Sequence, residues 1–445
     1  MMGDALRALD PVHQASLYIT IDQYEELIGL NDSFGTDLQR IINTLIHSRD
    51  PVVFYKMGVR TYDWGRETRI SGSEIRIERQ RDYVQVELAE VLIKTENSGG
   101  FGRDSRGWVF AQLAEDVAVR RIQCEGKPKA TVSDVRNMFS ELEPHKEAGA
   151  YLKRNKFAGY IYQCRLPKEL QLSLERLSVD MDAMDLHLAI AWSWQCVKRS
   201  MPLDDIISSY KDKPWINRWW HKERVELALI QLASANFQRR RFFGWNTIVY
   251  LSGGNISAFL LIFSMIWDAL LKQHADPLSL PQVSAPIQTD AILSASRAWL
   301  RRDQGDNEGG EYRYVALGRL GSAIRRAILD DKALSNPGHS GFSLRDDDLL
   351  SSRYMHLANI LNSGVKWALL EVRPHRSKQR IDGPRHKWYL HPLLSPSFEI
   401  PFKRVKEPLY VNNLDVVERW FFGDGPINFV ANPPLQRSRK LFSDE

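Results

Sequence analysis

Two apolar runs with an amphipathic segment between them are the first regular pattern in the chain. Residues 17–21 (LYITI) are mostly apolar or β-branched, which predicts a short buried strand. In residues 35–49 apolar side chains recur every three to four positions, which predicts an amphipathic helix. Asp50-Pro51 ends that helix, and residues 51–59 predict a second buried strand. The order strand, helix, strand favours part of an α/β sheet.

A third alternating stretch precedes a long helical region. Residues 82–88 (DYVQVEL) alternate between apolar and polar side chains and predict a third strand. The glycine-rich stretch 97–107 predicts a loop. Helical spacing then dominates, over residues 108–122, 135–142, 170–177, 184–199, 223–239 and 256–271.

The pattern changes again after a linker rich in proline and serine at residues 276–286. Helices are predicted over residues 288–300, 315–329 and 346–362. Two strands, 365–373 and 387–391, are then predicted around a polar tip. Helices followed by such a hairpin are typical of a winged-helix domain.

Composition indicates a folded protein of the cytoplasm. Apolar residues make up 43% and charged residues 26% of the 445 residues, which excludes a disordered chain and predicts two to four domains. The three cysteines form no CxxC pair, which argues for a reducing compartment and against structural zinc. The N-terminal residues do not read as a signal peptide, and Asp268 interrupts the most apolar stretch, so we expect no membrane segment.

Candidate chemistry begins at the end of the first predicted strand. Asp22 follows that strand directly, with Glu25 and Glu26 close behind it. The carboxyl ends of strands in an open α/β sheet are where such folds hold ligands, so an acid at this position is a candidate metal ligand. A core strand that ends in a solvated acid is the alternative.

The wording IDQYEEL at residues 21–27 resembles the DQFEEL form of the Walker B motif in STAND-type relatives of the AAA+ ATPases. The order strand, acid, helix, strand, Arg60 also resembles the third and fourth strands of P-loop NTPases. The resemblance implies that Asp22 helps to hold Mg²⁺, that Glu25 or Glu26 polarises water, and that Arg60 senses the γ-phosphate of ATP. The alternative for Arg60 is an exposed arginine at a strand end.

Gly253-Gly254-Asn255 precedes the apolar helix at 256–271. Two glycines allow a tight turn, and asparagine is a good N-cap. The same residues resemble the element before the last lid helix of AAA+ and origin-recognition-type ATPases, and the resemblance implies that they face the nucleotide. ATP and Mg²⁺ are the implied cofactors.

Two departures qualify this resemblance. Gln23 stands where the usual AAA+ motif has glutamate, and no G-x-x-x-x-G-K-[ST] phosphate loop occurs in the 445 residues. We therefore expect the C-terminal part of a longer ATPase, inactive alone, with an N-terminal half or a homo-oligomer as partner. The resemblance also leaves the predicted strand 82–88 without its neighbour.

The expected fold is a partial α/β P-loop NTPase core over residues 1–88, followed by a mainly α-helical lid region over 89–275. A winged-helix domain over 286–425 and a flexible tail over 426–445 complete it. The resemblance implies a regulatory ATPase that couples ATP binding to the winged helix, in DNA transactions or, by family analogy, antiphage defence.

Basic side chains gather around the tip of the predicted hairpin: Arg373, Arg376, Lys378, Arg380, Arg385 and Lys387. Such density suits contact with DNA phosphates, although winged helices also bind proteins and a solvated hairpin needs no ligand. The alternative function is a nucleotide-independent DNA-binding or scaffold protein.

A cluster of Asp180, Asp182, Asp185 and His187 could suggest a metal site or a hydrolase. We expect instead a solvated helix start, because acids are favoured near the positive end of a helix.

Overall fold

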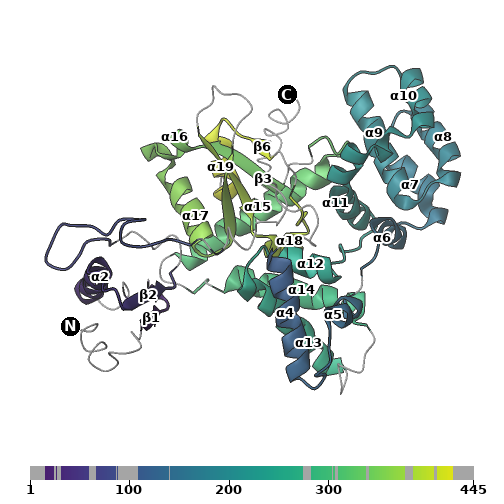
Figure 1. Cartoon of the computed structure of the whole chain (residues 1–445). Coiled ribbons are helices and arrows are strands. Elements are labelled where there is room, and N and C mark those ends of the chain that lie inside the picture. Colours follow the sequence, from purple (N-terminus) through teal and green to yellow (C-terminus); the bar gives the residue numbers. More distant parts are fainter. Residues whose placement is uncertain are drawn as a thin grey trace. The chain divides into compact units, whose positions relative to one another are not determined.

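The computed structural model describes residues 16–24, 27, 32–59, 67–86, 88, 109–139, 141–273, 282–302, 304–305, 309–336, 340–375, 384–404 and 408–423. The chain divides into two compact units, Met1–Leu92 and Ile93–Glu445. In Figure 1 the elements of the first unit are purple, and those of the second run from blue to yellow. The predicted tail at 426–445 lies outside the described residues.

The first unit contains a strand–helix–strand arrangement of β1 (Leu17–Ile21), α2 (Asp32–His47) and β2 (Val53–Met57). The two strands are parallel, with Leu17 opposite Val53 and Ile21 opposite Met57. Parallel strands need a crossover connection, and α2 supplies it. The two predicted strands and the helix between them are thus confirmed.

The prediction of a strand over residues 82–88 is wrong. Of this stretch, residues 84–86 lie outside any strand, and an isolated bridge joins Arg79 to Tyr83. Asp82 is the reason, because its carboxylate accepts hydrogen bonds from the Glu78 N–H at 2.8 Å and from Arg49 at 2.7 Å. These bonds fix a turn at the point where the strand would begin.

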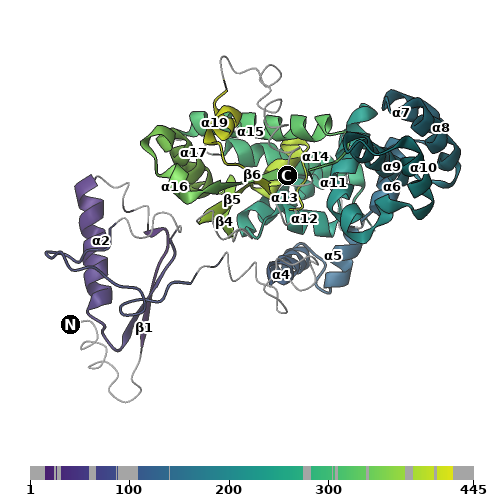
Figure 2. The same cartoon turned by 90° about the horizontal axis from the view of Figure 1, so that it is seen from above.

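The second unit begins with a group of helices that contact one another in pairs. They are α4 (Val109–Cys124), α5 (Val132–Met138), α12 (Trp245–Leu251), α13 (Ile256–Gln273) and α14 (Ala285–Arg301). Phe110, Trp245 and Phe259 pack as edge-to-face aromatic pairs between them. Figure 2 shows α13 and α14 side by side.

By length and composition α13 is the one helix among the described residues that could cross a membrane. Six of its side chains are buried, at positions three to four residues apart: Ala258, Phe259, Ile262, Phe263, Ile266 and Leu270. This spacing places an apolar face against α12 and α14. One face of the helix is thus part of the core of this unit, and 33% of the helix is buried.

A second group of helices forms the lobe on the right of Figure 1. It contains α6 (Pro144–Tyr151), α7 (Phe157–Gln163), α8 (Lys168–Leu177), α9 (Ala183–Lys198), α10 (Leu203–Ser209) and α11 (Arg218–Ala235). Arg240 is buried here and donates to Glu147 of α6 and Glu226 of α11, each at 3.0 Å. A buried guanidinium between two carboxylates fixes the relative position of those helices.

The last part of the unit is a four-stranded sheet with helices around it. The helices are α15 (Gly310–Asp330), α16 (Asp346–Leu349), α17 (Met355–Lys366), α18 (Ser395–Phe398) and α19 (Leu414–Phe421). The strands are β3 (Gly341–Arg345), β4 (Leu370–His375), β5 (Arg385–Leu390) and β6 (Leu409–Tyr410), in the order β4-β5-β3-β6. β5 is antiparallel to both β3 and β4, and β3 is parallel to β6.

The hairpin of β4 and β5 confirms the two strands predicted there. β3 was not predicted, and the single helix expected over residues 346–362 is divided into α16 and α17. Arg345 forms an ion pair with Asp348 at 2.9 Å across the start of α16, and Asp346 N–H donates to the carbonyl of Pro384 beside β5. These contacts turn the chain where the pattern alone favours a continuous helix.

Candidate functional site

Asp22 lies at the carboxyl end of β1, directly against the end of β2. The Gly58 N–H donates to the Ile21 carbonyl at 2.8 Å, which extends the parallel pairing to the residue before Asp22. A Cβ atom at position 58 would lie 2.6 Å from Asp22 Oδ1, so only glycine leaves room for that carboxylate. The structure thus places Asp22 at the end of the first strand, where the sequence predicts it, and against the end of the second strand.

A sharp turn after Asp22 fixes the direction of its side chain. Gln23 has a φ of 55°, in the left-handed region that side chains other than glycine rarely adopt, and its N–H donates to Asp22 Oδ1 at 2.9 Å. Such a residue persists only where its surroundings hold it.

Tyr24 supplies that support. Its side chain is buried, and its hydroxyl donates to Asn43 Oδ1 on α2 at 3.1 Å. Burial, aided by the negative charge of Glu67, raises the pKa of Tyr24 well above its usual value, so the hydroxyl stays protonated. Asn43 in turn donates to the carbonyls of Glu67 and Arg69. The turn is therefore tied to α2.

The chemistry available at this edge is that of an exposed carboxylate on a rigid support. Asp22 is exposed to solvent, which suits a ligand of hydrated Mg²⁺, since Mg²⁺ keeps several of its waters and takes one or two protein carboxylates. The predicted catalytic residues Glu25, Glu26 and Arg60 lie outside the described residues. Sequence reasoning did not identify Gly58 or Tyr24, which position the acid.

In the second unit, the predicted nucleotide-facing residues form the turn before α13. Asn255 caps the helix, because its Oδ1 accepts the N–H groups of Ser257 at 2.9 Å and Ala258 at 3.2 Å. Gly253 and Gly254 have φ values of 60° and 81°, so the tight turn predicted from the glycines is confirmed. Contact of these residues with a nucleotide stays a prediction.

Gly253 also lies against the C-terminal sheet. A Cβ at this position would meet His391 Nε2 at 2.9 Å and Glu371 Oε1 at 3.1 Å. Both atoms are buried, and neither has a hydrogen-bond partner among the described residues. Since His391 Nδ1 accepts the Leu393 N–H, the proton of the neutral ring resides on Nε2 and points toward this turn.

The negative charge of the buried Glu371 is balanced by two arginines. Burial would raise the pKa of Glu371, but the guanidinium groups of Arg404 and Arg373, both paired with it, hold that pKa below its usual value. Burial lowers the pKa of His391 to about 4, so this ring is neutral at physiological pH. The start of α13 is thus joined to the sheet by a buried polar cluster.

The structure changes the interpretation of the basic hairpin. Arg385 is only 2% exposed and donates to the carbonyls of Ser343 and Val411, so it holds strands together and does not face solvent. Arg373 pairs with Glu371, and burial together with the charge of Arg404 lowers the pKa of Arg373 to about 10. Both arginines have structural partners, which corrects their assignment as freely available DNA contacts.

The remaining residues of that set are placed differently. Lys387 lies on β5 with a half-buried side chain. Arg376, Lys378 and Arg380 lie outside the described residues. The DNA-binding prediction therefore depends on these three side chains.

Comparison with known proteins identifies the family of this chain. A sequence model of the ORC-CDC6-like family matches residues 18–410, which span β1 through β6. Neither a curated protein nor a solved structure matches the chain. The match covers most of the chain. It includes Asp22 at the end of β1 and the C-terminal sheet against which Gly253 lies. The chain belongs to the ORC-CDC6-like family and is thereby related to the AAA+ ATPases of origin-recognition type.

Proposed function

We propose that this protein is a regulatory ATPase of the ORC-CDC6-like family, in which the first unit supplies the magnesium-binding side of an ATP site. The observation that carries the proposal is the position of Asp22, held against Gly58 at the carboxyl edge of two parallel strands. In P-loop NTPases an acid at this place orients the Mg²⁺ that bridges the phosphates. Asp22 performs that role here.

The resemblance to P-loop NTPases also suggests roles for the other site residues. Glu25 or Glu26 orients the attacking water, and Arg60 contacts the γ-phosphate. Gly253, Gly254 and Asn255 face the nucleotide, as their resemblance to the element before the last lid helix of AAA+ and origin-recognition-type ATPases implies. Because Gly253 also contacts His391 and Glu371, a change of the turn on nucleotide binding reaches the C-terminal sheet directly.

Phosphate binding requires a loop of N–H groups and a lysine, and the 445 residues contain no G-x-x-x-x-G-K-[ST] sequence. The proposal therefore assigns these groups to another polypeptide segment. It follows that the 445-residue chain on its own shows no magnesium-dependent ATP hydrolysis. Hydrolysis by the isolated chain that Asp22→Asn abolishes would overturn this part of the proposal.

A photolabelling experiment tests the nucleotide role itself. The tagged chain is isolated from its own cells, with whatever companion it retains, and labelled with a photoreactive ATP analogue and Mg²⁺. We expect labelling that excess ATP prevents and that Asp22→Asn weakens by about tenfold or more, because removal of a metal ligand costs at least as much as removal of its supporting group. The matched control is Asp37→Asn, an exposed acid of α2. Equal labelling of both variants would contradict the proposal, as would no labelling at all.

A second function, DNA binding by the C-terminal domain, is favoured by the sheet topology. In β3-α16-α17-β4-β5 the first strand pairs with the last and the hairpin closes the sheet, and this topology supports the proposal of a winged helix. The sequence between β4 and β5 includes Arg376, Lys378 and Arg380.

Charge reversal at Arg376, Lys378 and Arg380 tests this role. It should weaken binding to duplex DNA and reduce the salt slope of log K by about three, at about 0.9 per phosphate contact. Reversal of the exposed Lys153, Lys156 and Lys168 should leave both unchanged. If the two triple variants bind DNA alike, the hairpin has no DNA role.

A further inference from the structure

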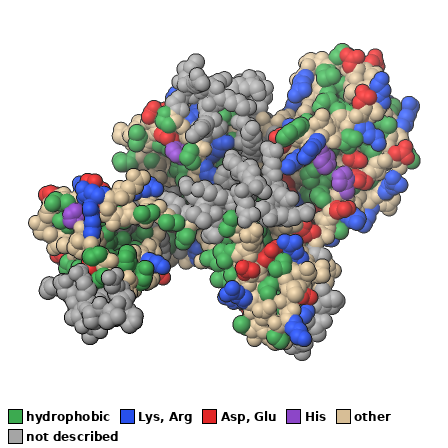
Figure 3. Space-filling view, viewed as in Figure 1, with side chains coloured by type: hydrophobic (Ala, Val, Ile, Leu, Met, Phe, Trp, Pro, Cys, Tyr) green, Lys and Arg blue, Asp and Glu red, His purple; other side chains and the backbone are tan. Residues whose placement is uncertain are grey.

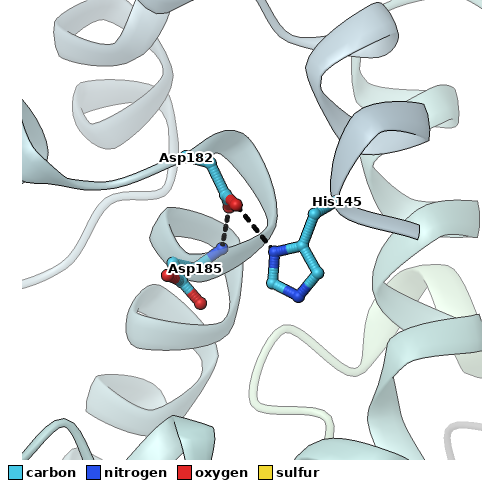
Figure 4. A group of neighbouring side chains, drawn as sticks. All are labelled: His145, Asp182 and Asp185. Carbon is cyan, nitrogen blue, oxygen red and sulfur yellow. Dashed lines mark hydrogen bonds and ion pairs between the residues drawn. The ribbon is translucent and has the colours of Figure 1, made fainter. Parts of the chain in front are cut away.

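Two helices of the second lobe, α6 and α9, bring together side chains that are far apart in sequence. His145 is in the first turn of α6, Asp182 is the N-cap of α9, and Asp185 is in its first turn. One ligand atom from each of these three residues lies within 4.8 Å of the others. Figure 4 shows the carboxylate of Asp182 turned toward the imidazole of His145, with Asp185 beside them.

Helix capping explains only part of this arrangement. Asp182 Oδ1 accepts the Asp185 N–H at 2.9 Å, as an N-cap does. The other oxygen of Asp182, Oδ2, contacts His145 Nδ1 at 2.7 Å, and the cap does not require that contact. The carboxylate of Asp185 has no part in the cap either.

Asp185 points to a missing ligand. Its Oδ1 atom is buried and has no hydrogen-bond partner among the residues that the structure describes. A buried carboxylate oxygen without a partner is costly to the folded state, and it calls for a cation or a donor. Burial and the charge of Asp182 raise the pKa of Asp185, whereas His145, His221 and Lys213 act in the opposite direction.

His221, in the first turn of α11, packs against these residues. Its ring stacks on the ring of His145, with centroids 5.6 Å apart and planes 13° apart. Figure 3 shows histidine and acidic side chains together at the surface of this lobe, so an ion can enter from solvent. Nitrogen and oxygen donors thus come from α6 and α9, and α11 contributes a ring that supports one of them.

We propose that His145, Asp182 and Asp185 bind a divalent transition metal of the zinc class, with the ring of His221 stacked on the ligand His145. Imidazole together with carboxylate favours Zn²⁺ over Mg²⁺ or Ca²⁺, which prefer oxygen ligands alone. The 2.7 Å contact between His145 Nδ1 and Asp182 Oδ2 is a hydrogen bond. Ligands of one tetrahedral zinc lie about 3.3 Å apart, so the ring moves by about half an ångström as the metal replaces the proton.

A metal bound at this site would stabilise the packing of the helices in this lobe. The metal joins α6 to the start of α9, and both helices already contact each other and α11, whose His221 stacks on His145. Two of these helices, α6 and α11, carry Glu147 and Glu226, which hold Arg240. Zinc binding therefore stabilises a part of the protein that is separate from the proposed nucleotide edge, and the inference does not rest on the proposed function.

Titration of the full chain with Zn²⁺ alone, followed by competition with a chromogenic chelator, tests the proposal. We expect one zinc per chain, and a Kd that rises by about tenfold or more in His145→Gln and in Asp185→Asn. Two controls keep the wild-type affinity: Asp180→Asn, an exposed acid beside the site, and Cys124→Ser, an exposed thiol. If the two site variants bind zinc as tightly as the wild type, or if the wild type binds none, the proposal is wrong.

Asp185→Asn also separates metal binding from folding. Without metal this variant should be at least as stable as the wild type, because the change removes a poorly compensated carboxylate. Saturating Zn²⁺ should then raise the Tm of the wild type and of Asp180→Asn, and leave the Tm of Asp185→Asn unchanged. An equal shift in all three proteins would place the bound zinc elsewhere and contradict the proposal.

Discussion

The two units of this protein reach stability by different means. In the first unit, the buried apolar side chains among the described residues are Tyr24, Ile46, Val53 and Ile77. The second unit buries whole aromatic clusters, and Trp215 and Phe259 within them are 0% exposed. The first unit relies instead on ion pairs and polar contacts, such as Glu67 with Arg40 and Arg69.

The sheets show the same contrast. One face of the β1–β2 pair exposes Tyr18 at 60% and Phe54 at 43%, and these two rings stack on each other. Parallel sheets are normally covered on both faces. In the four-stranded sheet of the second unit, Phe342, Leu344 and Trp388 are buried. The unit that carries the candidate nucleotide edge is thus the one with the smaller core.

The largest expected effect is in the core of the second unit. Trp215→Ala should lower the free energy of unfolding by about 3–5 kcal/mol, because a large buried ring is replaced by a cavity. Trp219→Ala is the control, since that side chain is 63% exposed, and it should cost less than about 1 kcal/mol. Denaturant unfolding followed by tryptophan fluorescence reports on this unit, because 12 of the 13 tryptophans follow residue 92. Equal losses would mean that the lobe is not closely packed.

Removal of the buried charge between α6 and α11 should have a comparable effect. Arg240→Met leaves Glu147 and Glu226 without their shared partner and should cost about 3–5 kcal/mol. Arg239→Met is the control, because the Arg239 side chain is 66% exposed. A loss below 1 kcal/mol in Arg240→Met would show that the carboxylates find other partners.

The ion pair of Arg240 and Glu226 also makes the stability of the second unit depend on pH. Burial would raise the pKa of Glu226, but the charges of Arg240 and Lys403 hold it below the usual 4.5. A depressed carboxyl pKa stabilises the fold above the unfolded pKa, so this contribution is lost as pH falls below about 4.5. Unfolding curves between pH 7 and 3 should show a smaller loss in Glu226→Gln than in the wild type. Parallel curves for the two proteins would contradict this assignment.

A smaller effect is expected at the contact between the lid turn and the C-terminal sheet. Gly253→Ala forces alanine to a φ of 60° and places Cβ 2.9 Å from His391 Nε2, so it should cost about 2–3 kcal/mol. Gly309→Ala has a φ of 89° in open space and should cost only the backbone part, about 1–2 kcal/mol. If the two variants lose the same stability, the side chains around Gly253 move to make room for the Cβ atom without lowering the free energy of unfolding.

The smallest effect is expected on the exposed face of the first unit. Phe54→Ser should change the unfolding free energy by about 1 kcal/mol or less, because this ring is 43% exposed and its ring contact is with the exposed Tyr18. Hydrogen exchange of the amides of β1 and β2 measures this change in the stability of the first unit. A loss of several kcal/mol would mean that another surface covers this face in solution and that the contrast between the units is smaller than the structure shows.

The sequence predicted what depends on local pattern. The order of β1, α2 and β2, the turn at Gly253 and the hairpin of β4 and β5 all follow from periodicity and from glycine or asparagine at defined positions. These features need no knowledge of distant residues. The family relationship, inferred from short motifs, is shown by the match over residues 18–410.

What the sequence did not predict depends on contacts between distant residues. The alternation at 82–88 favours a strand, yet the pairing of Asp82 with Arg49 makes a turn. Arg385 reads as a surface base, yet it is buried against Ser343. His145 is 37 residues from Asp182, so no local pattern shows that they meet.

The most direct test of the central claim is hydrogen–deuterium exchange at the carboxyl ends of β1 and β2. The protein is taken from its own cells with its companions, with and without Mg²⁺ and ATP, and Asp22→Asn is compared with Asp37→Asn. We predict that the nucleotide slows exchange of the amides of Gln23, Tyr24 and Gly58 in the wild type and in Asp37→Asn, but not in Asp22→Asn. Unchanged exchange at these amides in the wild type, or equal protection in Asp22→Asn, would contradict the assignment of this edge to ATP and Mg²⁺.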